Sequence, residues 1–435
     1  MKVELGRWLD ERPLGGFQIR LSLMCGLCAI LDGFDLQAMA YAAPSLRQLW
    51  HLESEALGPM LSAGLLGLLL GALLSGALSD RIGRRPVLLC STLLFAGGML
   101  CCARADSLWQ LLGWRLATGL GLGGVLPNAV ALVGEYSPAR RRASLTMLIS
   151  GCFTVGGLLG GLLSAWLIPA YGWRWVFCVG GVLPLLLWAW MLRELPESAK
   201  WLLLRGRAEA AAHWLRRMEP KLPADVEWAQ EERPEPRGAV RALFQNGRAR
   251  RTIMLWLLSF INLIVLYFLT SWMPLLLHTQ GLSLHYALLA SSMLQLGGVA
   301  GTFELGYWMD RRGFEGILTV CFLGAALSFW QLGMIEDQAP WLFVVLFCAG
   351  YFIIGAQPAL NTLAAGAYPT NLRATGVGWS LGIGRIGSVL GPSLGGAAIG
   401  AGWNAAALSC ALVSLAVLLA ALAWAYRQAG EQTGA

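Results

Sequence analysis

Runs of about 20 apolar residues alternate with short polar segments along nearly the whole chain. Each run is long enough to cross the hydrocarbon core of a bilayer as a helix that rises ~1.5 Å per residue. Twelve runs can be counted, and the pattern therefore predicts an all-α membrane protein with twelve transmembrane helices. They lie near residues 18–42, 57–78, 87–104, 108–134, 143–168, 174–193, 252–278, 285–309, 315–335, 340–364, 374–400 and 404–427.

A polar, proline-rich stretch from Arg193 to about Arg251 separates the first six predicted helices from the last six. We therefore expect an N-terminal six-helix bundle over residues 1–193, a central loop over 194–251 and a C-terminal six-helix bundle over 252–435. Inside the loop, residues 208–218 have a helical composition, and we expect this segment to lie along the membrane surface.

The two halves of the chain also repeat each other. The spacing GxxxDRxG occurs at residues 76–83 and returns at 306–313, which is 230 positions later (306 minus 76). A second match joins Tyr-Ser-Pro at 136–138 to Tyr-Pro at 368–369. A duplicated, pseudo-symmetric pair of bundles with a binding site between them is the architecture that such a repeat predicts.

The basic residues predict the orientation in the membrane. If the N-terminus is cytoplasmic, only Arg47, Arg104 and Arg174, out of 32 Lys and Arg residues, fall on the outer side. By the positive-inside rule both termini and the central loop are then cytoplasmic. The first apolar run is long and has no small-residue cleavage site, so we expect it to be retained in a bacterial inner membrane.

Composition excludes several classes of protein. A chain that is 57% hydrophobic and only 13% charged is not a soluble globular protein. The net charge of +7 is scattered over the cytoplasmic loops, which argues against nucleic-acid binding. The ten cysteines lie in the predicted helices, and Cys25-Gly-Leu-Cys28 has no second ligand pair, so we interpret it as packing. We expect no metal, no cofactor and a monomer.

Two carboxylates lie inside the first predicted helix, where an unpaired ion is costly and a charged side chain marks a functional site. Asp32 and Asp35 are three residues apart and share one face. Asp35 lies about seven residues from the outer end of its helix, and Arg115 lies about seven residues into the fourth helix, so both sit roughly 10 Å deep. They could pair, although Arg115 could instead only lock its helix to a neighbour.

The loop Gly-Ala-Leu-Ser-Asp-Arg-Ile-Gly-Arg-Arg at 76–85 resembles the signature of the major facilitator superfamily. Its Asp can cap a helix N-terminus and its arginines can contact the cytoplasmic surface. This resemblance implies a cytoplasmic gate, and the expected gating residues in the two loops are Asp80, Arg81, Arg84, Arg85, Asp310 and Arg311.

Three further segments resemble the aromatic acid:proton symporter family. They are Asp-Gly-Phe-Asp at 32–35, the Arg115 region of the fourth helix, and the eleventh helix with Arg-Ala-Thr-Gly-Val-Gly at 373–378 and Gly-Ile-Gly-Arg-Ile-Gly at 382–387. The resemblance covers nearly the full length. It implies proton-coupled import of benzoate-type acids by alternating access. The residues that the resemblance marks as functional are Asp32, Asp35, Arg115, Glu135, Arg373 and Arg385.

Position and charge suggest a role for each of these residues. Arg385 lies near the middle of the eleventh helix, and its counterpart in the first half is the neutral Thr154, which favours contact with an anionic substrate. Glu135 and Arg373 lie at cytoplasmic helix ends and are expected to form gate pairs. Glu304 is expected to act in the gate rather than in transport. Asp32, Asp35 and Arg115 are expected to share a single proton.

Aromatic and polar residues inside the helices could line the pocket for the ring. Many tryptophans belong to the interfacial belts of a membrane protein, and amides can equally bond helix to helix. The candidates for substrate contact besides Arg385 and Arg115 are Phe34, Asn128, Asn262, Tyr267, Gln357, Asn361 and Trp379.

Two other function classes were weighed. Efflux by proton antiport is the alternative, but the antiporter pattern GxxxGPxxGG falls at 387–396 in the eleventh helix, whereas the fifth helix has no such proline. A membrane enzyme or receptor is not supported, because the sequence shows no nucleotide-binding loop, no metal-ligand cluster, no catalytic triad and no appended soluble domain. The sequence therefore favours import over efflux and gives no indication of an enzyme.

Overall fold

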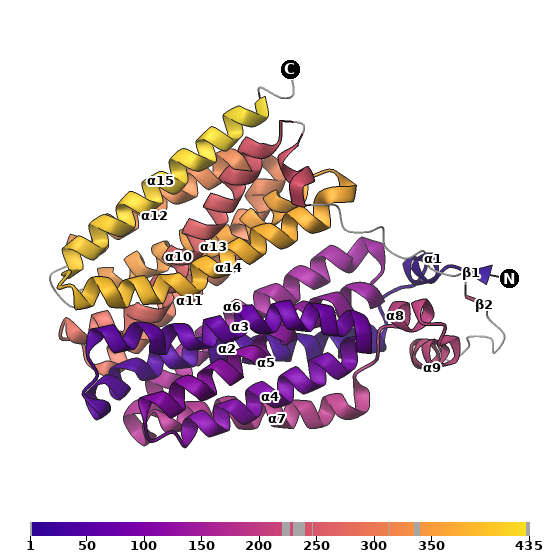
Figure 1. Cartoon of the computed structure of the whole chain (residues 1–435), viewed down its shortest axis with the longest axis horizontal. Coiled ribbons are helices and arrows are strands. Elements are labelled where there is room, and N and C mark those ends of the chain that lie inside the picture. Colours follow the sequence, from indigo (N-terminus) through magenta and orange to yellow (C-terminus); the bar gives the residue numbers. More distant parts are fainter. Residues whose placement is uncertain are drawn as a thin grey trace. The chain divides into compact units, whose positions relative to one another are not determined.

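The computed structural model describes residues 2–219, 227–228, 240–245, 247–312, 314–334 and 340–431. Within these ranges the regular secondary structure is helical except for one short pair of strands (Figure 1). Strand β1 (Lys2–Val3) lies parallel to β2 (Glu227–Trp228). The prediction of an all-α protein is therefore confirmed.

Twelve long helices occupy the described part of the chain, one at each apolar run that the sequence predicts. The first six are α2 (Gly16–Trp50), α3 (Ser54–Ile82), α4 (Arg84–Ala103), α5 (Leu108–Tyr136), α6 (Ala139–Tyr171) and α7 (Arg174–Glu194). The last six are α10 (Ala249–Thr279), α11 (Leu284–Arg312), α12 (Phe314–Met334), α13 (Trp341–Gly366), α14 (Thr370–Gly400) and α15 (Ala405–Glu431).

Short helices accompany the long ones. The chain begins with α1 (Leu5–Asp10), and the central segment holds α8 (Ala199–Leu204), α9 (Ala208–Met218) and the 3-10 helix η1 (Val240–Phe244). Helix α9 covers the residues expected to be helical. It is amphipathic, since Ala211 and Leu215 are buried while Arg216 and Arg217 in its last turn are exposed.

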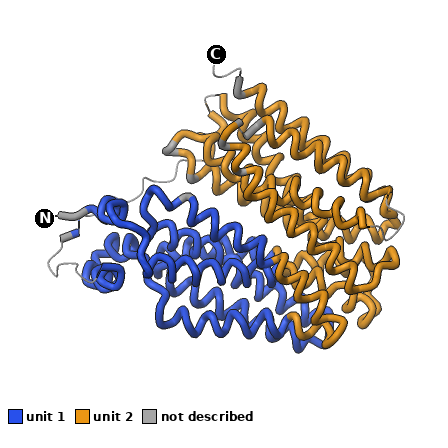
Figure 2. Tube along the Cα trace, turned by 180° about the vertical axis from the view of Figure 1, so that it is seen from behind, with its two compact units in different colours: residues 1–36, 66–156, 177–234 blue, residues 37–65, 157–176, 235–435 orange. Residues whose placement is uncertain are grey.

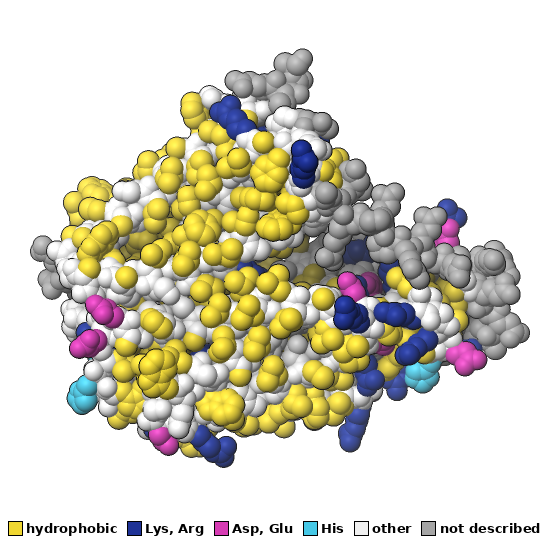
Figure 3. Space-filling model, in the orientation of Figure 1, with side chains coloured by type: hydrophobic (Ala, Val, Ile, Leu, Met, Phe, Trp, Pro, Cys, Tyr) yellow, Lys and Arg dark blue, Asp and Glu magenta, His cyan; other side chains and the backbone are white. Residues whose placement is uncertain are grey.

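Nine of the long helices have the length and composition to span a membrane among the described residues. The three that fall outside this set are α2, α11 and α14, and each carries some of the charged residues expected to act in transport or gating. Helices are the favoured form because a bilayer offers no partners for free backbone groups. Figure 3 shows hydrophobic side chains along their flanks, as lipid contact requires.

The chain divides into two compact units (Figure 2). Unit 1 comprises Met1–Leu36, Leu66–Gly156 and Phe177–Pro234, and unit 2 comprises Gln37–Leu65, Gly157–Val176 and Glu235–Ala435. Unit 2 thus takes in one end of α2, α3 and α6 together with the C-terminal helices. The expected division into residues 1–193, 194–251 and 252–435 follows the sequence repeat and stays a prediction.

Glycine lets equivalent helices approach closely within each unit. A methyl group at Gly123 of α5 would lie 2.4 Å from the backbone nitrogen of Ala72 in α3. In unit 2, a methyl group at Gly350 of α13 would lie 1.8 Å from the backbone oxygen of Leu294 in α11. The second and fourth long helices of each half therefore pack backbone to backbone, which agrees with the repeat in the sequence.

Candidate functional site

The two acidic residues of α2 are buried in unit 1. Asp32 is 1% exposed and Asp35 is 0% exposed. The helix runs unbroken through both residues, and leucine, alanine and phenylalanine lie around them. With an i, i+3 spacing, the two carboxyl groups lie one helical turn apart on neighbouring parts of one face.

Arg115 of α5 pairs with Asp35. Its Nη1 lies 2.8 Å from Asp35 Oδ1, and its Nη2 donates to the Asp35 backbone oxygen at 3.3 Å. The guanidinium also lies 3.7 Å from the sulfur of Met99. Arg115 is 2% exposed, so the ion pair is shielded from water and its attraction is strong. The structure thus brings together the two residues that helix depth suggested as partners.

This cluster has the chemistry of a proton site. It holds two carboxyl groups and one guanidinium, and protonation of one carboxyl group would leave the three residues neutral in sum. Asp35 contacts Arg115 directly and Asp32 lies one helical turn from Asp35, so we treat the three residues as one titrating group. The proton therefore cannot be assigned to Asp32 or Asp35 alone.

Arg385 of α14 lies in unit 2 and is half-buried. Among the described residues it forms no ion pair, and its backbone oxygen accepts a hydrogen bond from Ser388 Oγ at 2.6 Å. A guanidinium inside the membrane-spanning part of a helix is costly when no anion neutralises it. Arg385 thus differs from Arg115, whose charge is already paired within the protein.

Three amides form a hydrogen-bonded relay between α10 and α13. Asn262 Nδ2 donates to Gln357 Oε1 at 2.8 Å, and Gln357 Nε2 donates to Asn361 Oδ1 at 3.2 Å. Asn262 is fully buried, whereas Gln357 and Asn361 are half-buried. The relay is therefore compatible with both interpretations left open by the sequence, because it bonds helix to helix and its half-buried end at Asn361 can meet a ligand.

The other candidates for substrate contact have varied surroundings. Asn128 is buried and donates to the Gly124 backbone oxygen of its own helix at 2.8 Å. Phe34 is buried, and Tyr267 is half-buried. Trp379 is exposed and stacks on Trp256 with ring centroids 5.9 Å apart. Their roles in binding stay predictions.

The N-terminus of α4, which lies in the first GxxxDRxGRR loop, is capped by a carboxylate, but this carboxylate is not that of Asp80. Glu197 Oε1 accepts hydrogen bonds from the backbone nitrogens of Arg84 at 2.8 Å and Arg85 at 3.1 Å, at the start of α4. The expectation that Asp80 caps this helix is wrong. The Asp80 side chain is exposed, and its backbone oxygen accepts from Trp201 Nε1 at 3.0 Å.

Sequence reasoning gave Glu197 no role, although it stands in Pro-Glu-Ser-Ala-Lys-Trp at 196–201. Its carboxylate also accepts from the Ser198 backbone nitrogen at 2.8 Å. Tyr136 donates to the Glu197 backbone oxygen at 2.6 Å. The signal that could have found Glu197 is an acidic residue just after the sixth transmembrane run, because an anion stabilises a helix N-terminus.

The other expected gate residues of the first half meet close by. Arg84 Nη2 lies 2.6 Å from Glu135 Oε1, and both side chains are largely buried. Arg85 Nη2 donates to the Leu192 backbone oxygen at 2.7 Å. The exposed Arg81 offers its backbone oxygen to Arg205 at 3.2 Å. The loop is thus tied to the end of α5 and to the central segment.

The second loop shows fewer contacts. Arg311 lies over the ring of Tyr307 at 4.3 Å. Glu304 and Arg373 are exposed. The side chain of Asp310, which was expected to match Asp80, lies outside the described residues.

A seam inside unit 2 joins ends of α2, α3 and α6 to the C-terminal helices. Ser62 Oγ of α3 lies 2.8 Å from Ser393 Oγ of α14 and donates to the Val389 backbone oxygen at 2.9 Å. Gln48 Nε2 of α2 lies 2.9 Å from His278 Nε2 of α10. These contacts join helices from both halves of the sequence, and we call them the unit 2 seam.

No group of three or more His, Cys, Asp or Glu side chains in the described ranges could hold a metal ion. The buried charges and amides are therefore the chemistry that the site offers.

Comparison with known families agrees with this arrangement. The model of the Major Facilitator Superfamily matches residues 25–392. The chain belongs to this superfamily. A D-xylose-proton symporter of known structure superposes with a TM-score of 0.73 at 18% identity, covering 94% of this chain and 97% of the other, which shows a shared fold.

Curated relatives extend over nearly the whole chain. The 4-hydroxybenzoate transporter PcaK of Pseudomonas aeruginosa is 38% identical, and the alignment covers 97% of this chain and 96% of the relative. The gallate transporter of Pseudomonas putida is also 38% identical, with 97% of this chain and 94% of the relative covered. The 3-(3-hydroxy-phenyl)propionate transporter of Escherichia coli is 35% identical, with 89% of each chain covered. This superfamily member is accordingly a multi-pass membrane transporter and not an enzyme.

Proposed function

We propose that this transporter imports a small aromatic carboxylate together with protons by alternating access. The relatives of similar length carry 4-hydroxybenzoate, gallate or hydroxyphenylpropionate in their names, which supports a ring-bearing acid as substrate. The observation that carries proton coupling is the buried cluster of Asp32, Asp35 and Arg115.

Proton uptake is coupled to substrate transport if the distance between α2 and α5 changes when the substrate cavity switches between facing outward and facing inward. A carboxylate beside Arg115 is favoured in its charged form, and one moved away from it in the apolar interior takes up a proton. The proton affinity then differs between the two facing directions. An inward proton gradient would in this way drive accumulation of the acid.

Arg385 is proposed to hold the substrate carboxylate. Its planar guanidinium can form two parallel hydrogen bonds with a carboxylate. It is half-buried and has no ion-pair partner among the described residues, so its guanidinium can bind an anionic ligand. The relay that ends at Asn361 is proposed to contact ring substituents, with Phe34, Asn128, Tyr267 and Trp379 as further lining residues.

Two gates fit this cycle. We assign the cytoplasmic gate to the loop around Arg84, Glu135 and Glu197, together with Asp80, Arg81, Arg85, Glu304, Asp310, Arg311 and Arg373. We assign the outer gate to the unit 2 seam, because Gln48 and Ser62 lie at the ends of α2 and α3 that the positive-inside rule puts outside.

The proposal includes the setting of the protein. It is a monomer in a bacterial inner membrane, with both termini in the cytoplasm and a six-helix bundle on either side of residues 194–251. The distribution of Lys and Arg supports this orientation. No cofactor takes part.

The test is uptake of 4-hydroxybenzoate into proteoliposomes that contain the purified chain. Uptake should exceed equilibrium when the outside is more acidic, and a proton ionophore should abolish the excess. Accumulation that survives the ionophore would contradict symport. Faster loss of preloaded acid under the same inward gradient would instead favour efflux by antiport.

A further inference from the structure

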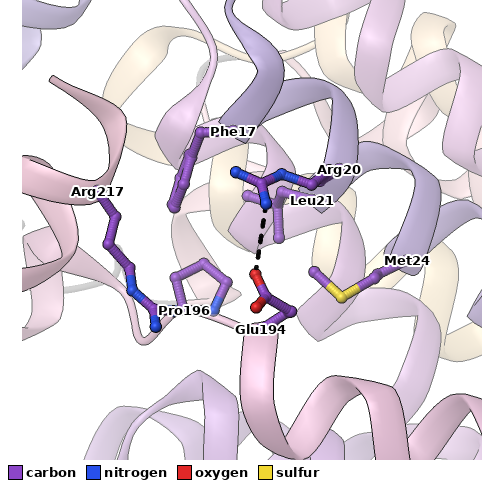
Figure 4. A pocket seen from close by; sticks show the side chains of 7 residues that line it. All are labelled: Phe17, Arg20, Leu21, Met24, Glu194, Pro196 and Arg217. Carbon is purple, nitrogen blue, oxygen red and sulfur yellow. Dashed lines mark ion pairs between the residues drawn. The ribbon is translucent and has the colours of Figure 1, made fainter.

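A cavity of about 210 Å³ lies in unit 1 where α2 begins, α7 ends and α9 passes (Figure 4). At ~30 Å³ per water molecule in the liquid, this space can hold several water molecules or a group of similar size. The transport cycle described above does not use it. Its lining residues are Phe17, Arg20, Leu21, Met24, Glu194, Pro196 and Arg217.

The residues that α2 contributes follow from helical geometry. Phe17, Leu21 and Met24 have the spacing i, i+4, i+7, so they lie on one face and give the cavity an apolar wall. Arg20 shares this face, and Figure 4 shows its guanidinium pointing toward Glu194. The charged end of Arg20 thus lies beside apolar side chains and close to a carboxylate, while its side chain stays 59% exposed.

The ion pair in the cavity is loose. Arg20 Nη1 lies 3.7 Å from Glu194 Oε2, and the two side chains are 59% and 37% exposed. An exposed pair of this length contributes little stability. Arg20 Nε also donates to the Gly16 backbone oxygen at 3.4 Å, a long bond. Most of the five N–H donors of Arg20 are thus available to a ligand.

Arg217 adds a second positive charge to the cavity and packs against the ring of Trp214. Its guanidinium lies 5.0 Å from the ring centroid of Trp214, and the Arg85 guanidinium lies 5.7 Å from the same centroid. Within the described ranges Arg217 has no carboxylate partner. Two arginines and one glutamate leave the cavity with a net charge of +1.

The setting of the cavity is a membrane boundary. Ile19 and Leu23, on a neighbouring face of α2, are 61% and 53% exposed, which suits lipid chains. Lys and Arg gather at the end of unit 1 that carries α8 and α9 (Figure 3). A basic pocket between membrane helices on the cytoplasmic side is suited to a phosphate-bearing headgroup.

We propose that this cavity binds a phosphate ester anion through Arg20 and Arg217, either as the headgroup of a cytoplasmic-leaflet phospholipid or as a soluble phosphate ester. The charge balance favours a monoanion. The cytoplasmic side is part of the orientation proposed above, but binding itself can be measured without transport, so a failure of one proposal is distinguishable from a failure of the other.

The experiment is native mass spectrometry of the full chain in detergent, titrated with phosphatidylglycerol. Diacylglycerol with the same acyl chains is the lipid control, because it lacks the phosphate. One phosphatidylglycerol should stay bound while diacylglycerol does not. Arg217→Gln should weaken this binding roughly tenfold, since it removes charge-assisted hydrogen bonds. Glu194→Gln should strengthen it by removing the competing carboxylate.

The matched variant is Arg141→Gln, which removes one exposed positive charge at the start of α6 and leaves the cavity intact. It should bind phosphatidylglycerol like the wild type. Equal losses in Arg141→Gln and Arg217→Gln would overturn the site in favour of general attraction to a basic surface.

A second arm distinguishes the two sources of phosphate. Thermal unfolding is followed with glycerol 3-phosphate or inorganic phosphate in place of lipid. Protection by phosphatidylglycerol alone, lost in Arg217→Gln, supports a lipid headgroup, and equal protection by the soluble phosphates supports a soluble ligand. If neither protects the wild type more than Arg217→Gln, the cavity does not bind phosphate.

Discussion

Arg115 and Asp35 form a buried ion pair with a distance of 2.8 Å between Nη1 and Oδ1, and their side chains are 3% and 0% exposed. A second hydrogen bond joins the same guanidinium to the backbone oxygen of Asp35. The pair therefore ties α5 to α2 and at the same time puts a titratable carboxyl group beside a permanent positive charge. One contact serves both packing and proton chemistry.

Removing one partner of this pair should cost more than removing both. Arg115→Gln leaves the Asp35 carboxylate buried without its cation, a change that costs about 3–5 kcal/mol. The double variant Arg115→Gln with Asp35→Asn should recover part of this loss, because no ion stays unpaired. Thermal unfolding in detergent measures both. A double variant less stable than Arg115→Gln alone would contradict the pairing.

The cap on α4 predicts a smaller effect. Glu197→Gln keeps an acceptor oxygen for the nitrogens of Arg84 and Arg85 but removes the negative charge at the start of α4, and we expect a loss of about 0.3–1 kcal/mol together with slower transport. Glu209→Gln, an exposed change in the first turn of α9, is the control. Equal unfolding temperatures for the two variants would show that the negative charge of the cap contributes nothing to stability.

Arg385→Lys should lose most substrate binding although the charge is kept. A single ammonium cannot replace the two parallel hydrogen bonds of a guanidinium. Binding of 4-hydroxybenzoate by thermal shift measures the effect, since a ligand of the folded state raises its stability. Arg141→Lys at the surface is the control. Unchanged affinity in Arg385→Lys would move the carboxylate contact elsewhere, with Arg115 the next candidate.

Glycine contacts at the unit 2 seam predict a steric effect. A methyl group at Gly396 of α14 would lie 2.8 Å from the Cα of Gly58 in α3, so Gly396→Ala should force these helices apart. We expect a cost of about 1–3 kcal/mol and slower substrate exchange. Gly378→Ala makes the same change in the same helix where no atom lies within 4 Å. Equal exchange rates in the two variants would contradict a role of the seam in gating.

Much of the fold could be predicted from the sequence, because each membrane helix must satisfy its own backbone and needs a long apolar run. The depth of Asp35 and Arg115 along their helices also suggested their pairing. The cap by Glu197 could not be found in this way. Glu197 lies after α7 and is 113 residues from Arg84 at the start of α4, so the contact depends on how the helices pack. The contact of Gln48 with His278 spans 230 residues and depends equally on packing between helices.

The amides show another limit of sequence reasoning. Asn262, Gln357 and Asn361 were candidates for substrate contact as separate residues. The structure links them in one relay, so each donor and acceptor in it depends on the others. A sequence contains no direct sign of such a relay, because α10 and α13 lie far apart along the chain and their register is set by packing.

Asp32 and Asp35 are proposed to carry the coupled proton, and two assays on the same proteoliposomes test this directly. One assay is accumulation of 4-hydroxybenzoate driven by an acidic exterior, and the other is exchange of labelled for unlabelled acid without a gradient. We expect Asp32→Asn and Asp35→Asn each to abolish accumulation while at least one of them still exchanges substrate. Accumulation at the wild-type rate in the double Asn variant would contradict this assignment and leave Glu135 or Glu304 as the proton carrier.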